Sequence, residues 1–259
     1  MSLPKYNFQG LNISIFNELE LNKFIEDVLL KNSTIVAYGY SIGIIPKIKA
    51  FPSLLEVSNN FELLVTDGRL FYLYLKFFGA PLVYDISIPN LVLKSLSIAE
   101  KKHARVFFLG GSADANTKAL YNVKLKYPNI SEVNGYHGFW SDKKIVIDLI
   151  SSIAPDIIYI ALPTPEKEIL ASEFKLLSLG RIIIPCGGMI DVLAGDKKIT
   201  PRILKKIGLA WFYRFIQEPS VRYKLLVQSL WSLLILTKII IRDKLFFKKN
   251  DAYLKYIKS

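Results

Sequence analysis

Short apolar runs alternate with longer helical segments along most of this chain, and this alternation constrains the fold more than any other feature. The runs are rich in β-branched and aromatic residues and are bounded by Gly, Pro, Asp or Asn. They predict strands at residues 34–39, 61–66, 105–109, 130–134, 156–161 and 181–185, with helices at 90–102, 113–127, 143–153 and 166–177. Strands that alternate with helices form βαβ units, so we expect an α/β fold: a Rossmann-like, mainly parallel sheet with helices on both faces.

The composition indicates a folded domain in a reducing compartment. Of the 259 residues, 51% are hydrophobic, which excludes a globally disordered chain. Cys186 is the one cysteine, so no disulfide can form within the chain and a cytoplasmic setting is expected. We expect no secretory signal, and no uninterrupted apolar stretch reaches the roughly 18–20 residues of a spanning helix.

The net charge of +12 lies entirely in the last quarter of the chain. Residues 1–196 contain 19 basic and 19 acidic residues, whereas residues 197–259 contain 15 basic and three acidic ones. Such a segment favours an anionic partner. Because Trp, Leu and Ile are interleaved with the basic residues, a phospholipid surface fits better than a solvated tail. No nucleic-acid-binding module is recognisable, so we expect no nucleic-acid partner.

We therefore divide the chain into a core at residues 1–199 and a helical, basic and apolar appendage at residues 200–259. The apolar part of this appendage, residues 225–237, would form a helix about 20 Å long, which is short of the roughly 30 Å hydrocarbon thickness of a bilayer. We expect the appendage to lie in the membrane interface, which makes the protein peripheral. A helix buried against a partner subunit is the alternative, and it leaves a homo-oligomer open.

Two pairs of glycines follow predicted strands, where α/β proteins bind their ligands. Gly110 and Gly111 precede a predicted helix and would let backbone N–H groups approach a phosphate or a sugar, although a tight packing turn has the same sequence. Gly187 and Gly188 are followed by Asp191. That carboxylate could accept hydrogen bonds from ribose hydroxyls, or it could simply be an acid stabilised at a helix N-terminus.

Asp67 stands at the end of a third predicted strand and is followed by Gly68. A carboxylate at a strand tip is well placed to act as a general base toward a sugar hydroxyl. The competing interpretation is that Asp67 caps a helix beginning at Arg69, and the residues by themselves favour this cap.

Residues 211–224 offer donors for a diphosphate. Arg214 and Gln217 are spaced to share one face of a helix, and Arg222 follows the break at Pro219. A diphosphate needs several donors that converge on its oxygens, and Arg supplies a bidentate fork.

Nothing in the sequence predicts a metal or a cofactor. There is no Asp-x-Asp pair and no Walker loop, and His103 and His137 stand in no Cys/His cluster. His137 fits a position in the cleft or in a plain turn. We interpret Cys186 as a small buried residue and not as a nucleophile.

Five blocks of the sequence, taken in order and with their spacing, resemble the WecG/TagA/CpsF glycosyltransferase family, also called glycosyltransferase family 26. The blocks are TDG at 66–68, RVFFLGGSA at 105–113, YHGFW at 136–140, APDIIYIALPTPEKE at 154–168 and PCGGMIDVLAGDKKITPRILKKIGLAWFYRFIQEPSVR at 185–222. The resemblance extends over residues 10–230, and its last block is the most specific.

The resemblance implies an enzyme that transfers a hexosyl or N-acetylhexosaminyl group, with inversion, from a UDP-sugar to a polyprenyl-diphosphate-linked saccharide. The reaction would take place on the cytoplasmic face of the bacterial inner membrane, in the synthesis of cell-wall polymers or exopolysaccharides. The catalytic base of the family falls on Asp67. The nucleotide-sugar site is assigned to Gly110, Gly111, Tyr136, Gly187, Gly188 and Asp191, and the site of the lipid diphosphate is assigned to Arg214, Gln217 and Arg222.

The chain departs from the family pattern around the expected sugar pocket. The Thr-x-Asn element of the family reads AYGYS here, with Tyr38 and Tyr40 at or near those places, and its Pro-Lys-Gln-Glu element reads PTPE at 163–166. Asn90 stands near an expected Asp. These differences leave the donor sugar open. They also leave open a catalytically degenerate member of the family that binds lipid or assists assembly.

Overall fold

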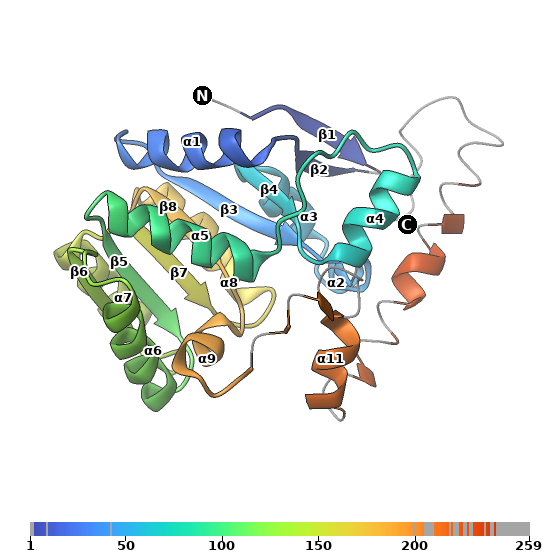
Figure 1. The fold of residues 1–259 in the computed structure, drawn as a ribbon. Coiled ribbons are helices and arrows are strands. Elements are labelled where there is room, and N and C mark those ends of the chain that lie inside the picture. The colour runs from blue at the N-terminus through green and yellow to red at the C-terminus, as the bar shows by residue number, and fades with distance from the viewer. Residues whose placement is uncertain are drawn as a thin grey trace.

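The computed structural model describes residues 3–8, 10–41, 43–198, 200–201, 203–204, 210–217, 219, 223–224, 227, 230–235, 237–238 and 241. Its centre is a six-stranded sheet with helices on both faces, and a two-stranded hairpin lies beside one end of that sheet (Figure 1).

All neighbouring strands of the central sheet run parallel. The order across the sheet is β4-β3-β8-β7-β5-β6. The strands are β3 (Ile35–Tyr40), β4 (Leu63–Thr66), β5 (Arg105–Gly110), β6 (Glu132–Tyr136), β7 (Ile157–Ala161) and β8 (Ile182–Pro185). The sequence predicted all six to within two residues at each end, and the parallel sheet is confirmed. Because every strand runs the same way, the segments that follow the strands all emerge at one edge.

The sheet separates two hydrophobic cores. Successive residues of β3 alternate between them, with Val36 and Tyr38 in one core and Ile35 and Ala37 in the other. Because both faces are covered, the strands read as continuous apolar runs and not as apolar–polar alternation.

Within the described part of the chain, four helices cover one face of the sheet and five cover the other. On the first face lie α1 (Glu18–Leu29), α5 (Ile88–Lys101), α6 (Ala113–Lys126) and α9 (Met189–Ala194). On the second lie α2 (Ile44–Ala50), α3 (Ser53–Asn59), α4 (Arg69–Phe77), α7 (Lys143–Ile153) and α8 (Glu166–Leu176). The helices predicted at residues 90–102, 113–127, 143–153 and 166–177 are confirmed as α5, α6, α7 and α8.

Helix α1 was not predicted, although its start carries a readable signal. The Asn17 side chain accepts a hydrogen bond from the Glu20 N–H at 2.9 Å, and the Glu20 carboxylate accepts one from the Asn17 N–H at 2.7 Å. This reciprocal capping box satisfies two N–H groups that a helix start leaves free.

A hairpin of β1 (Lys5–Phe8) and β2 (Leu11–Ser14) closes the β4 end of the sheet. Ser14 Oγ accepts a hydrogen bond from the Leu64 N–H at 3.0 Å, so the hairpin meets the backbone of edge strand β4. Edge strands present unpaired N–H and C=O groups, and covering them prevents pairing with another chain.

Beyond the last strand, the structure includes helix α11 (Ala210–Gln217) and several shorter helical stretches. Ile235 packs against the core, and the hydroxyls of Tyr74 and Thr237 are 3.2 Å apart, so this part of the chain contacts α4 (Figure 1). Within the described ranges, no helix combines the length and the apolarity needed to cross a bilayer.

Candidate active site

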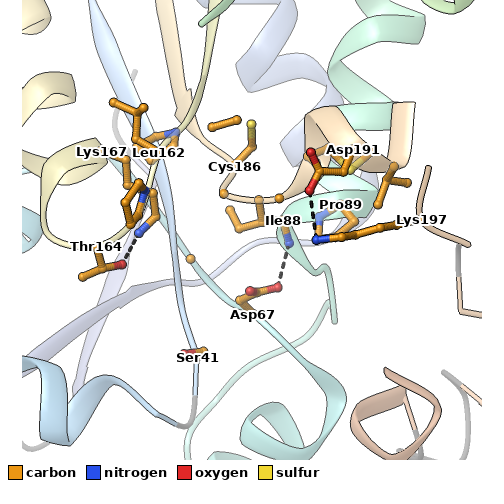
Figure 2. A pocket seen from close by; sticks show the side chains of 18 of the residues that line it. Ser41, Asp67, Ile88, Pro89, Leu162, Thr164, Lys167, Cys186, Asp191 and Lys197 are labelled. Carbon is orange, nitrogen blue, oxygen red and sulfur yellow. Dashed lines mark hydrogen bonds and ion pairs between the residues drawn. The ribbon is translucent and has the colours of Figure 1, made fainter. Parts of the chain in front are cut away.

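A cavity of about 510 Å³ opens at the edge of the sheet where the parallel strands end. The segments that follow β3, β4, β5, β7 and β8 all contribute to its lining, together with the start of α5 and with α9. Parallel α/β sheets bind ligands outside the carboxyl ends of their strands. Figure 2 shows Asp67 between two sides of this cavity, with Lys167 and Thr164 on one side and Asp191 and Lys197 on the other.

Asp67 lies in the cavity lining directly after β4. Its backbone N–H donates to the Tyr40 carbonyl at 2.8 Å, and its Oδ1 accepts a hydrogen bond from the Ile88 N–H at 3.1 Å. Ile88 is the first residue of α5, so the Asp67 carboxylate caps α5. It does not cap α4, whose N-cap is Gly68 and whose start has no side-chain hydrogen bond. The cap of the helix beginning at Arg69, which the sequence suggested, is therefore wrong, and Asp67 caps a helix that begins 21 residues later.

The turn at Asp67 depends on two glycines. Gly68 has a φ of +115°, which side chains of L-residues rarely permit, and it lets the chain turn from β4 into α4. Gly39 faces the start of α5: a Cβ at that position would lie 2.5 Å from Ile88 Cγ1 and 3.0 Å from Asp67 Cβ. Because Gly39 has no side chain, the start of α5 can pack directly against β3, close to the Asp67 side chain.

Gly187, Gly188 and Asp191 lie together on another wall of the cavity. A Cβ at Gly187 would meet no atom within 4 Å, and a Cβ at Gly188 would meet only Asp191 Oδ2, at 3.8 Å. The space beside this backbone is therefore open to a ligand. The Asp191 carboxylate pairs with Lys197 Nζ at 2.9 Å, so the acid is held in position at the rim.

Gly110 and Tyr136 lie outside the cavity lining, whereas Gly111 is part of it. A Cβ at Gly110 would lie 2.3 Å from the Ala161 carbonyl oxygen, so this glycine allows β5 and β7 to pack closely. Tyr136 stacks on His137 with ring centroids 4.4 Å apart, and the described segment between β6 and β7 contributes no residue to the cavity lining. Of these three residues, the structure brings only Gly111 together with Asp67 and Asp191.

A cluster of buried polar side chains lies on the Lys167 side of the cavity. Glu168 is fully buried, and its Oε1 accepts hydrogen bonds from the Tyr38 hydroxyl at 2.9 Å and the Thr164 hydroxyl at 3.1 Å. Lys167 Nζ forms an ion pair with the same oxygen and lies 5.9 Å from the centre of the Tyr38 ring. Burial, followed by the charge of Glu168, raises the pKa of Tyr38 well above its ordinary value, so this hydroxyl remains a donor.

The two tyrosines at the departure from the family pattern have different places. Tyr38 lines the cavity, whereas Tyr40 is fully buried, and its hydroxyl lies within hydrogen-bonding distance of Ser58 Oγ at 3.0 Å and Asn59 Oδ1 at 2.9 Å. Tyr40 therefore fastens β3 to α3, and Tyr38 is the one that a ligand in the cavity would meet.

Neither the thiol nor the histidines offer an activated group in the cavity. Cys186 lines it, but desolvation raises the pKa of Cys186 to about 12, so the thiol stays protonated. Nδ1 of His137 accepts a hydrogen bond from the Phe139 N–H at 3.1 Å, which fits the turn interpretation. Among the described residues, no group of His, Cys, Asp and Glu side chains could hold a metal ion.

Sequence reasoning assigned no role to four lysines of the cavity lining, Lys47, Lys167, Lys197 and Lys198. Lys47 stands on α2, a helix that no apolar pattern predicted, and Lys167 stands within the block matched at residues 154–168 but was given no role. The residues predicted for the lipid diphosphate belong to the C-terminal part. Arg214 and Gln217 lie on helix α11, whose backbone is described, and Arg222 lies outside the described residues.

Known proteins with similar sequences share one activity in their names. This chain is 29% identical over 170 residues to the N-acetylglucosaminyldiphosphoundecaprenol N-acetyl-β-D-mannosaminyltransferase of Bacillus spizizenii, a match covering 65% of the chain and 66% of the relative. Relatives of the same name from Staphylococcus aureus and Bacillus subtilis are each 31% identical, over 163 and 124 residues. These matches cover 62% and 48% of the chain, and 63% and 48% of the relatives. The chain thus spans about two thirds or less of the curated relatives it matches.

The family comparison extends much further along the chain. The family described as "Glycosyl transferase WecG/TagA/CpsF family" matches residues 6–249, which include every strand of the sheet and every segment that lines the cavity. The chain belongs to the WecG/TagA/CpsF family of glycosyl transferases.

Proposed function

We propose that this protein is an inverting glycosyltransferase that moves a sugar from a UDP-sugar to a polyprenyl-diphosphate-linked saccharide. One observation carries the proposal: the cavity at the carboxyl edge of the sheet brings the Asp67 carboxylate together with the open Gly187–Gly188 turn and Asp191. Membership of a glycosyl transferase family supports it. The relatives' names describe transfer of an N-acetylmannosaminyl group to a lipid-diphosphate-linked N-acetylglucosamine.

Asp67 is the general base of this reaction. A sugar hydroxyl is a weak nucleophile at neutral pH, so its proton must leave as its oxygen attacks the anomeric carbon. The new C–O bond forms on one face of the donor sugar while the bond to the UDP oxygen breaks on the other, and the proton passes to Asp67. The Ile88 N–H holds Oδ1, and among the described residues Oδ2 accepts no hydrogen bond, which leaves Oδ2 to take the proton.

The nucleotide occupies the wall formed by Gly187, Gly188 and Asp191. Bare backbone allows a phosphate to approach N–H groups closely, and an acid beside it suits ribose hydroxyls. Gly111 borders the same space, and Gly110 contributes by setting the packing of β5 against β7. Tyr136 remains part of the proposed nucleotide-sugar set on the resemblance alone.

The acceptor's diphosphate is bound from the C-terminal part of the chain, by Arg214, Gln217 and Arg222. This part also holds the protein on the cytoplasmic face of the membrane as a peripheral appendage, residues 200–259. Exposed apolar side chains at Leu230, Trp231 and Leu234 support this role, because they accompany the excess of basic residues.

The donor is a UDP-hexose or a UDP-N-acetylhexosamine, with or without a carboxylate on its sugar. Tyr38, Thr164 and Lys167 surround the side of the cavity where the chain departs from the family pattern, so the donor sugar need not be the N-acetylmannosamine of the relatives. The same departures favour a second candidate, a degenerate member of the family that binds lipid without turnover.

A donor screen tests the proposal and separates the two candidates. Purified protein is incubated with a panel of UDP-sugars and a short-chain lipid-diphosphate saccharide, and the product is identified by mass spectrometry. We expect one or a few donors to yield a product lengthened by one sugar, with inverted anomeric configuration. Binding of the acceptor without any product from the whole panel would favour the degenerate partner and contradict the transferase.

A further inference from the structure

Lys47 has an unusual environment in the cavity. It stands on α2 just after β3, is half-buried and lines the cavity. Among the described residues, its ammonium group forms no hydrogen bond and no ion pair within 4 Å. Burial and then the neighbouring Lys167 lower the pKa of Lys47, while the charges of Glu168 and Asp67 act in the opposite direction.

Two other lysines of the lining have carboxylate partners. Lys167 pairs with Glu168, and Lys197 pairs with Asp191 at 2.9 Å. The charges of Glu168 and Asp67 act on Lys47, but neither carboxylate pairs with it. Oε1 of Glu168 already receives three donors, and its buried Oε2 has no partner among the described residues. The folded chain thus carries a partly desolvated positive charge at this end of the cavity.

A half-buried cation without a partner is unfavourable, because desolvation penalises its charged form. The penalty is offset when an anion of a ligand enters and forms a charge-assisted hydrogen bond. The cavity of about 510 Å³ that Lys47 lines has room for such a ligand.

We propose that Lys47 binds an oxyanion of the UDP-sugar donor at the Lys167 end of the cavity. This inference rests on the proposed function and adds a donor-binding residue to it. The oxyanion belongs either to the diphosphate or to a carboxylate on the donor sugar. Both are oxygen anions that an ammonium group can reach as a point charge.

Calorimetric titration of the full-length protein with UDP, UDP-N-acetylglucosamine and UDP-glucuronate tests the inference. Lys47→Met keeps the length of the side chain and removes its charge. Lys49→Met makes the same change at an exposed position of the same helix and serves as the control. Thermal melting shows whether each variant is folded, and Lys47→Arg tests rescue by another cation.

We expect Lys47→Met to weaken binding by roughly 10- to 100-fold, as loss of a hydrogen bond to a charged group does, while Lys49→Met and Lys47→Arg bind nearly as the wild type does. Equal weakening for all three ligands assigns Lys47 to the diphosphate. Weakening confined to UDP-glucuronate assigns it to a sugar carboxylate.

Two results would overturn the inference, and they differ in what they say about the proposed function. If the wild-type protein binds the ligands and Lys47→Met binds them with the same affinity, the role of Lys47 is refuted and the proposed function stands. If the wild-type protein binds none of the three, the proposed function fails and the inference fails with it.

Discussion

Single residues in this protein acquire their roles from partners that are remote in the sequence. The Asp67 carboxylate accepts a hydrogen bond from the N–H of Ile88, 21 positions further along the chain. The Glu168 carboxylate accepts one from the hydroxyl of Tyr38, which is 130 positions away. Each contact places one polar atom at the edge of the same cavity. The chemistry proposed here can therefore be tested by changes of a few atoms.

Replacement of Asp67 by Asn should reduce kcat by about 10²- to 10⁴-fold, the usual effect of losing general-base catalysis. The Asn oxygen can still accept the Ile88 N–H, so the fold and UDP binding should be retained. Asp142→Asn is a matched control, because Asp142 also accepts an N–H at a helix start, that of Lys144 at 2.8 Å, away from the cavity. A nearly normal kcat for Asp67→Asn would show that Asp67 caps α5 but is not the general base.

Alanine substitutions at Gly188 and Gly110 should have opposite effects: the first should weaken ligand binding, and the second should destabilise the fold. Gly188→Ala adds a methyl group in open space at a φ of −71°, so the free energy of unfolding should change by less than about 1 kcal/mol. The same methyl group should weaken UDP binding by about tenfold, equivalent to about 1.4 kcal/mol. Gly110→Ala should lower the free energy of unfolding by roughly 3 kcal/mol or more, because its Cβ meets the Ala161 carbonyl.

Chemical denaturation and UDP titration of both glycine variants measure these effects. A stable Gly110→Ala protein would contradict the packing role of Gly110. If Gly188→Ala leaves the UDP affinity unchanged, the nucleotide does not bind beside Gly188.

At the scale of elements, the cavity depends on how helices are fastened to the ends of strands. Polar contacts join helix α5 to the sheet at two places. Asp67 caps its start, and in the middle of the helix the hydroxyl of Ser95 lies 2.9 Å from that of Tyr159 in the core. Helix α8 is fastened to β3 by the hydrogen bond between Tyr38 and Glu168. These links set the width of the site between α5 and α8.

Tyr38→Phe removes one hydrogen bond to a buried carboxylate and should lower the free energy of unfolding by about 2 kcal/mol. For a chain of this size, that corresponds to a fall in Tm of roughly 4–8 °C. The control is Tyr121→Phe, because the Tyr121 side chain is 70% exposed on α6. Differential scanning calorimetry compares the two, and an unchanged Tm for Tyr38→Phe would show that α8 is held by apolar packing alone.

At the scale of the molecule, the excess positive charge and most of the cavity lining come from different parts of the chain. Residues 1–196, which form most of the cavity lining, have no net charge, whereas residues 197–259 carry the whole excess of +12. The contact between Tyr74 and Thr237 brings the basic part of the chain against α4, which begins two residues after Asp67. A protein attached to an anionic surface through this part would therefore hold its cavity near the proposed lipid-linked acceptor.

Removing two exposed positive charges should weaken attachment to anionic vesicles. Each basic residue near such a surface contributes about 1 kcal/mol, so Lys224→Gln with Lys238→Gln should lower the partition coefficient by roughly 30-fold. Lys124→Gln with Lys144→Gln makes the same change on the exposed surface of the core. Sedimentation with vesicles of phosphatidylglycerol measures both, and equal losses in the two double variants would show attachment that has no preferred surface.

The local sequence determined the repeating elements of this protein. The six strands and four of the helices follow from apolar periodicity and from the Gly, Pro, Asp and Asn residues between them, because burial on both faces selects continuous apolar runs. The positions of Asp67, Gly187 and Gly188 just after strands follow as well, and so does that of Asp191 in the segment after Gly188. Parallel strands bring such positions to a single edge, so the sequence could place these residues in one site.

The tertiary structure alone decided which atoms meet. Helices α2 and α3 are short, and the hairpin of β1 and β2 pairs only four residues on each strand, so neither gives a strong periodic signal. The partner of the Asp67 carboxylate, the cluster around Glu168 and the exposure of Lys47 to the cavity all involve segments that are distant in the chain. Local propensity acts over a few residues, whereas these contacts are set by the strand order β4-β3-β8-β7-β5-β6, and that order is fixed only when both cores are packed.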